Sequence, residues 1–186
     1  MGLADIAKKV ADAKASGSGN HIRPGRGILM VKEMKYDAKG HKGEKFIAEL
    51  RVVESVSIAG RTDKEGKPVL ANEPGSTVSF VQLFDQHKET AFPNTKAFFL
   101  ALYGEKEEEI SGEDLAGAIL AACNGSKQPT RGMLIKYETV DKVTKKDVAI
   151  IVPKWEYVPN QSEETIAKNR AWLDGVEKAE KPAETK

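Results

Sequence analysis

The sequence has little that would support a disulfide-bonded, membrane-spanning or secreted protein. Its 186 residues contain a single cysteine, Cys123, which excludes an internal disulfide framework and is typical of a reducing compartment. No run of about 18 apolar residues occurs, so the sequence predicts no membrane-spanning helix. The opening MGLADIAKKVADAK mixes lysines and aspartates with its apolar residues and lacks the uninterrupted apolar core of a secretory signal. We therefore expect a cytoplasmic protein without membrane association.

Groups that could act together in catalysis are also scarce. The three histidines, His21, His41 and His87, fall in predicted loops, without a paired cysteine or the HExxH spacing of a zinc site. Cys123 follows two alanines at an apolar helix end, where a cysteine is usually a small buried hydrophobe and not a nucleophile. The glycines of GSGNHIRPGRG lack the Lys-Ser or Lys-Thr ending of a phosphate-binding loop. These observations favour a protein that is not an enzyme and that uses no cofactor or metal.

Aromatic residues make up only 6% of the chain, and the net charge is +1, but the charges are unevenly distributed. Residues 105–114, EKEEEISGED, are acidic, and a basic stretch follows that contains Lys127, Arg131, Lys136, Lys142, Lys145 and Lys146. One interpretation is that both stretches are solvated surface. The other is a charge-segregated molecule that presents one face to a polyanion.

The order of the predicted elements is the most informative positive feature. Strand-like alternation occurs five times, in residues 27–36, 44–53, 76–84, 131–140 and 147–158. A short helix, residues 94–104, lies between the third and fourth strands, with Asn94 as the predicted N-cap and Gly104 as the C-terminal stop. This order predicts a mostly β protein with peripheral helices (α+β): a five-stranded OB-like barrel with a helix between strands 3 and 4. OB-folds bind oligonucleotides or oligosaccharides.

The remaining segments complete the predicted domain organisation. Residues 1–19 form an N-terminal amphipathic helix and a flexible SGSG tether, 20–160 the OB-like nucleic-acid-binding domain, 161–175 a C-terminal helix capped by Ser162, and 176–186 a disordered tail. Inside the domain, 59–74 reads as a long loop, and Ser111 with Asp114 as a capping box for a second helix that ends at Asn124. The 94–104 helix plugs the barrel through Ala97, Phe98, Ala101 and Leu102.

An OB-fold binds its ligand across strands 2 and 3, between the strand 1–2 and strand 4–5 loops. Both predicted loops contain several lysines, which would neutralise phosphates at the two ends of a groove. Aromatic residues with polar tips at strand ends beside lysines would stack on bases at the groove margin, whereas Phe80 and Phe84 belong to the core. The predicted nucleic-acid-binding residues are Lys35, Tyr36, Lys39, Lys42, Lys45, Arg51, Lys136, Tyr137, Lys142, Lys145, Lys146, Trp155 and Tyr157.

Several segments carry a resemblance to a known family. HIRPGRGILMVKEMKY, FIAELRVVES, PGSTVSFVQLF, NTKAFFLALYG and VPKWEYVP, in this order within residues 20–160, resemble small phage-encoded single-stranded-DNA-binding proteins of the OB-fold type. The resemblance implies non-specific coating of single-stranded DNA in replication and recombination, without cofactor or chemistry. It also implies replication proteins as partners, although the tail KAEKPAETK lacks the family's acidic, hydrophobic-ended terminus. RNA binding and self-association stay open.

Two other hypotheses compete with nucleic-acid binding. A structural or protein-interaction module of a phage, such as a particle component or an inhibitor, would expose an apolar patch in place of a continuous basic groove. A nuclease-type enzyme would need clustered acids in a cleft, which the sequence does not display.

Overall fold

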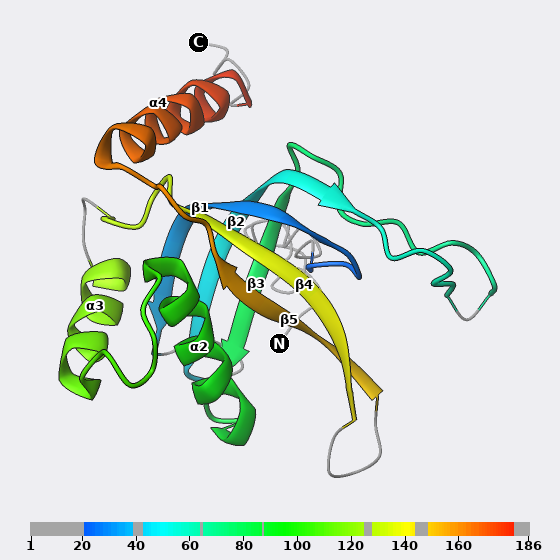
Figure 1. Ribbon diagram of the computed structural model, residues 1–186, viewed down its shortest axis with the longest axis horizontal. Helices are drawn as coiled ribbons and strands as arrows, with labels where there is room; N and C mark the ends of the chain where they lie inside the picture. The colour runs from blue at the N-terminus through cyan, green and yellow to red at the C-terminus, as the bar shows by residue number, and fades with distance from the viewer. Residues whose placement is uncertain are drawn as a thin grey trace, which may run out of the picture.

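A computed structural model describes residues 21–38, 43–63, 65–86, 88–124, 128–143 and 149–180. Within them, Figure 1 shows one sheet with helices around it. The elements are β1 (Arg26–Asp37), β2 (Lys45–Val56), β3 (Thr77–Leu83), α2 (Lys88–Tyr103), α3 (Gly112–Asn124), β4 (Leu134–Val143), β5 (Ala149–Tyr157) and α4 (Glu163–Glu180).

The five strands form one antiparallel sheet in the order β3-β2-β1-β4-β5. The predicted strands and the helix between the third and fourth are confirmed, and the fold is α+β. None of the helices in the described part of the chain is long and apolar enough to cross a membrane.

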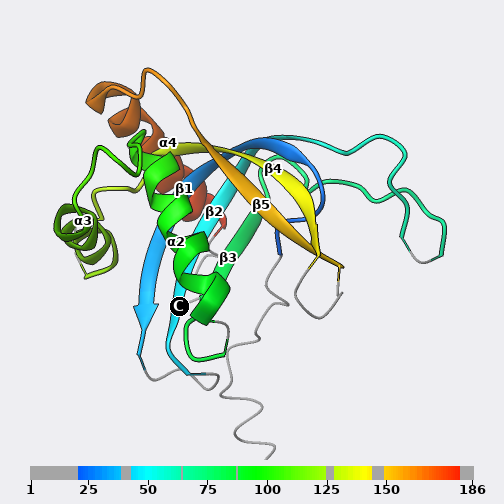
Figure 2. The ribbon, with the colours of Figure 1, turned by 60° about the horizontal axis from the view of Figure 1, so that its bottom comes forward.

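The sheet is not closed into a barrel, in contrast to the prediction. Strands β3 and β5 are its two edges, and the described residues form no ladder between them. The helix α2 packs against both edge strands instead (Figures 1 and 2). Phe98 of α2 stacks on Phe80 of β3, with 5.3 Å between the ring centroids. Both of these rings also contact Trp155 of β5 edge-on, each at 5.0 Å between centroids. Aromatic packing therefore joins the two edges where a barrel would use backbone hydrogen bonds.

The alternation of β2 directs one set of side chains to the core and the other to the outer face of the sheet. Phe46, Ala48, Leu50 and Val52 are at most 2% exposed. In β1 the alternation shifts at Lys32, because the pairing register with β2 changes between Val31 and Glu33. This β-bulge explains why Lys32 breaks the apolar pattern of the strand.

The helix α2 begins six residues before the predicted start. Asn94, the predicted N-cap, lies inside the helix directly after Pro93, and its side chain donates a hydrogen bond to Gln82 at 3.3 Å. The end at Gly104 is confirmed, and its φ of +73° is the left-handed conformation that favours glycine after a helix. Of the predicted plug residues, Phe98 and Leu102 are fully buried, whereas Ala97 is exposed. The buried stripe is rotated and consists of Ala91, Thr95, Phe98, Phe99 and Leu102.

The predicted caps of the later helices are confirmed. Ser111 accepts a hydrogen bond from the backbone N–H of Asp114 at 3.1 Å, and Ser162 accepts one from that of Thr165 at 3.2 Å. The helix α4, however, passes the predicted end near Gly175 and continues to Glu180. The prediction of a disordered tail is therefore wrong for residues 176–180, while 181–186 and the predicted N-terminal helix and tether (1–19) lie outside the described residues.

The predicted loop between β2 and β3 is confirmed. Figure 1 shows the loop extending away from the sheet. Within the loop, Thr62 and Pro68 form an isolated antiparallel β-bridge. The Asp63 carboxylate accepts hydrogen bonds from the backbone N–H groups of Glu65 and Lys67 at 2.8 and 2.9 Å, which organises the tip as a turn. At its base, Asn72 accepts a hydrogen bond from the Arg23 backbone at 2.7 Å.

Candidate nucleic-acid interface

The ligand surface expected from the sequence is the outer face of β2 and β3. On β2 the residues that alternate with the core set are Ile47, Glu49, Arg51 and Val53. The pairing register places Val81 opposite Ile47, Ser79 opposite Glu49 and Thr77 opposite Arg51. Among the described residues of β2 and β3, no outer-face position is aromatic, so these two strands provide no stacking platform.

The helix α4 packs on one end of this outer face. Its first half is held by the turn before β4: Asn169 donates to the Gly132 carbonyl at 2.8 Å, and Arg170 donates to the Arg131 and Pro129 carbonyls at 2.7 and 2.6 Å. A Cβ at Gly132 would lie 2.8 Å from the Ile166 carbonyl oxygen, so only glycine allows this approach. Leu173 is 1% exposed and anchors the helix from its apolar side.

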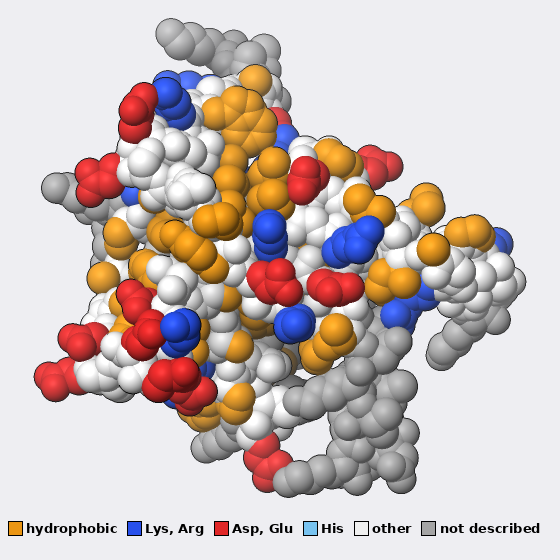
Figure 3. All heavy atoms as spheres, viewed as in Figure 1, with side chains coloured by type: hydrophobic (Ala, Val, Ile, Leu, Met, Phe, Trp, Pro, Cys, Tyr) orange, Lys and Arg blue, Asp and Glu red, His pale blue; other side chains and the backbone are white. Residues whose placement is uncertain are grey.

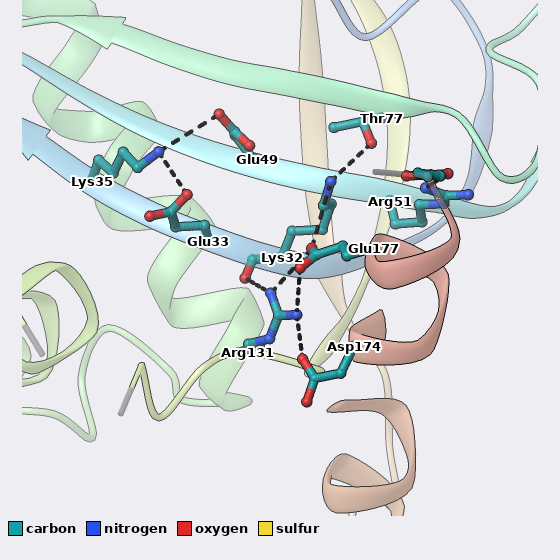
Figure 4. Close-up of polar contacts among 10 residues, drawn as sticks. Lys32, Glu33, Lys35, Glu49, Arg51, Thr77, Arg131, Asp174 and Glu177 are labelled. Carbon is teal, nitrogen blue, oxygen red and sulfur yellow. Dashed lines mark hydrogen bonds and ion pairs between the residues drawn. The ribbon is translucent and has the colours of Figure 1, made fainter. Parts of the chain in front are cut away.

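Three cations under α4 bind three of its carboxylates (Figure 4). Arg131 donates to Asp174 at 2.8 Å, to Glu177 at 3.1 Å and to the Lys32 carbonyl at 2.8 Å. Lys32 lies 3.7 Å from Glu177 and reaches across β2 to the Thr77 hydroxyl at 3.3 Å. Arg51 pairs with Glu180 at 2.8 Å. Burial lowers the pKa of Arg131, but its hydrogen bonds to Asp174 and Glu177 raise it by more.

Trp172 joins this cluster from the exposed side of α4. Its ring centroid lies 5.9 Å from the Arg51 guanidinium carbon, within the range of a cation–π contact, and its side chain is 49% exposed. The cluster of Lys32, Arg51, Arg131 and Trp172, called here the α4 cluster, combines cations with an accessible ring. Of its members, only Arg51 is among the predicted nucleic-acid-binding residues, and Arg131 belongs to the basic stretch noted in the sequence. The acidic residues of α4 at 174, 177 and 180 were the available signal, because their spacing of three places them on one helix face that requires cationic partners.

Two other predicted cations of the sheet, Lys35 and Lys45, are also paired. Lys35 lies 2.6 Å from Glu33 and 4.0 Å from Glu49, and the hydrogen bond to Glu33 raises its pKa. Lys45 lies 3.2 Å from Asp37. These pairs reduce the positive potential of the outer face, so the described sheet is not a continuous basic groove.

The outward faces of β4 and β5 alternate in charge. The β4–β5 pairing places Lys136 opposite Glu156 and Glu138 opposite Lys154. All four side chains are exposed. In Figure 3, blue and red side chains alternate across the middle of the molecule, over these strands. Lys136 is thus accessible as predicted, but it belongs to a nearly neutral surface.

Two of the four predicted stacking residues are buried, and the prediction that they line a groove margin is wrong. Tyr137 is 2% exposed and Trp155 is 9% exposed, and both belong to the main core. Their strands alternate strictly, with Lys136 and Glu138 around Tyr137 and Lys154 and Glu156 around Trp155. That alternation was the sequence signal for burial. Burial also raises the pKa of the Tyr137 hydroxyl.

The other two are exposed but lie away from the outer face. Tyr36, 44% exposed, pairs with Phe46 in register and lies on the core side at the end of β1. Tyr157, 43% exposed, packs its ring beside Gly104, where a Cβ would lie 2.8 Å from the ring. Lys39, Lys42, Lys145 and Lys146 lie outside the described residues, as does the side chain of Lys142.

An apolar pocket of about 860 Å³ opens between α2, α3 and the β1–β2 end of the sheet. Its wall includes Phe46, Phe84, Leu115 and Ile119, and its mouth includes Phe92 and Leu120, which are 54% and 60% exposed. Cys123 also lines the pocket, and burial raises the pKa of its thiol to about 11. The thiol is therefore protonated at neutral pH, which agrees with the prediction of a small hydrophobe and not a nucleophile.

The described residues contain no group of three or more His, Cys, Asp or Glu that could hold a metal ion. His21 is exposed beside Ser79, and His41 and His87 lie outside the described part of the chain. Comparison with models of known protein families finds no match, and a search of curated proteins finds no significant relative.

Proposed function

We propose that this protein binds single-stranded nucleic acid, DNA in the first place, without sequence specificity and without catalysis. The family resemblance described above assigns such binding to DNA replication or recombination in a phage-infected cell. The strand order supports the proposal, because an OB barrel opened between its third and fifth strands has the order β3-β2-β1-β4-β5. The position of α2 between β3 and β4 supports it as well.

The observation that carries the proposal is the α4 cluster. An exposed indole beside a guanidinium offers a surface on which an unpaired base can stack. The cations of the cluster are neutralised by Asp174, Glu177 and Glu180, so the attraction for phosphates would have to come from other residues. The described elements offer no regular set of contacts to base edges, so we expect binding without sequence specificity.

Phosphates beyond the cluster would be bound by the two lysine-bearing turns. The β1–β2 turn follows Asp37 at one end of β1, whereas β4 runs past Arg26, at the other end of β1, toward the β4–β5 turn. A strand lying along the outer face would therefore meet one turn at each end. Because the sheet cations are paired with acids, the lysines of these turns would supply most of the backbone attraction.

The experiment is a fluorescence anisotropy titration with a labelled 30-nucleotide single strand, its duplex and the equivalent RNA. We expect the single strand to bind at least tenfold tighter than the duplex, because only unpaired bases can stack on Trp172. Two unrelated single strands of equal length should bind within about threefold of each other. Preference for the duplex, or binding to one sequence alone, would contradict the proposal.

A second candidate function, protein interaction, is favoured by one specific observation. The pocket between α2 and α3 exposes Phe92 and Leu120 at its mouth, and such apolar side chains are typical of an interaction site. A partner protein would bind there and not at the α4 cluster.

A further inference from the structure

We infer that the apolar pocket between α2 and α3 binds the amphipathic N-terminal segment of the same chain, residues 1–14. The pocket has the volume of a ligand site, about 860 Å³, and opens to solvent beside the exposed Phe92 and Leu120. Exposed side chains of this size around an apolar cavity gain free energy when a second apolar surface covers them. The inference is independent of nucleic-acid binding, because the pocket lies apart from the α4 cluster.

The spacing of apolar residues in the segment fits a helix-in-groove contact. Leu3, Ile6, Ala7 and Val10 follow the i, i+3, i+4, i+7 pattern by which amphipathic helices place anchors in an apolar groove. The pocket wall is aromatic and aliphatic, with Phe46, Phe84 and Ile119 among its residues, which suits aliphatic anchors. The polar residues of the segment would face the solvent.

The charges around the pocket complement those of the segment. Figure 3 shows acidic side chains gathered over the α2–α3 connection. Lys96 is neutralised by Glu107 at 2.5 Å and Lys106 by Glu109 at 2.9 Å. Glu105, Glu108 and Glu113, close in sequence to the lining residues Glu107 and Leu115, have no ion-pair partner among the described residues, so this side of the pocket is negative. The segment contains Lys8, Lys9 and Lys14 beside its apolar stripe, against Asp5 and Asp12.

The pocket lies within reach of the segment in the same molecule. His21 pairs with Ser79 on the edge strand β3, and Phe84, which lines the pocket, follows Ser79 by five residues, or about 17 Å of extended strand. Residues 15–20 span at most about 20 Å, so residues 1–14 can dock without help from a second copy. The SGSG in this connection permits the reversal of direction that docking requires.

The test uses the full-length protein and its single cysteine. Because Cys123 lines the pocket, a docked segment protects its thiol from N-ethylmaleimide. We expect the triple variant Leu3→Ser, Ile6→Ser, Val10→Ser to react about tenfold faster than the parent, which equals about 1.4 kcal/mol of docking free energy. The matched control Asp5→Ser, Asp12→Ser changes residues on the opposite helix face and should not react faster than the parent. Equal rates in all three proteins would overturn the inference.

A pocket variant and a dilution series complete the experiment. Leu120→Glu should accelerate the reaction by a similar factor. Combining it with the triple variant should give no further increase in rate, because both changes remove the same contact between the segment and the pocket. The parent rate should stay constant over about two orders of magnitude of protein concentration. Faster reaction on dilution would assign the pocket to the segment of another copy and would contradict docking within one chain.

Discussion

Replacement of Trp172 by alanine tests the role of the α4 cluster in binding. The ring is 49% exposed, so about half of its 150–250 Å² is buried, and its loss removes roughly 100 Å² of contact, or about 2.5 kcal/mol of stability at 25 cal/mol/Å². The cation–π contact with Arg51 adds about 0.5–1 kcal/mol at such a site. A domain of ordinary stability tolerates this loss and stays folded at 25 °C.

The effect on nucleic-acid binding should be separate from the effect on stability. Stacking of one base contributes about 1–3 kcal/mol, so we expect the dissociation constant for a single strand to rise about 5- to 150-fold. Intrinsic fluorescence gives a second readout: a single strand should quench the parent but not the variant, whose remaining tryptophan, Trp155, is buried in the core.

The matched control is Phe92→Ala, which removes an exposed aromatic residue at the pocket, outside the α4 cluster. This variant should bind the single strand like the parent. If Trp172→Ala also binds like the parent, and if a single strand leaves the parent fluorescence unchanged, the α4 cluster is not the binding site.

Three further predictions concern stability and reactivity. Phe98→Ala should lower the free energy of unfolding by about 3–5 kcal/mol in denaturant titrations, because Phe98 is fully buried among rings that join β3 to β5. A loss below about 1 kcal/mol would show that the edges are joined by other contacts. Arg131→Ala should lower the free energy of unfolding by about 1–3 kcal/mol, because Arg131 links α4 to Lys32. Hydrogen exchange should increase in α4, while β1 and β2 keep their protection. A uniform increase of exchange across all elements would contradict this prediction. The raised pKa of Cys123 means that the folded state retains the thiol proton up to about pH 11, so stability should fall as pH rises from 9 to 11. The free energy of unfolding of Cys123→Ala should lack this decrease between pH 9 and 11. If its pH profile is identical to that of the parent, the thiol does not cause the decrease.

Local patterns predicted most of the fold. Period-two alternation located all five strands within a few residues, and the serines at 111 and 162 marked the starts of α3 and α4 because a side-chain oxygen there satisfies a free backbone N–H group. Such interactions act between residues close in the chain, and this is why a single sequence reveals them.

Contacts between distant residues escaped prediction. The continuation of α4 past Gly175 depends on Glu177 and Glu180 meeting Lys32, Arg131 and Arg51, which lie 46 to 145 positions away in the chain. The failure of the barrel to close depends on the volume of α2 between β3 and β5, where three large rings meet. Neither effect has a local signature.

The site was predicted less well than the fold. The outer face and Arg51 were identified from the alternation of β2, but Tyr137 and Trp155 were chosen for their polar tips although alternation places them in the core. Trp172 was overlooked because its significance comes from its position beside Arg51, not from its neighbours in the sequence. The lysine turns, which lie outside the described residues, stay a prediction.

The most direct test of nucleic-acid binding is the salt dependence of single-strand affinity. If Lys39, Lys42, Lys145 and Lys146 each neutralise one phosphate, log K should fall with log salt at a slope of about −2.8, or about 50-fold between 50 and 200 mM salt. Fluorescence anisotropy with a labelled oligothymidine at four salt concentrations measures this slope. A steep slope with little dependence on base sequence is the predicted result, whereas an affinity unchanged by salt, or no binding at 50 mM salt, would contradict the account.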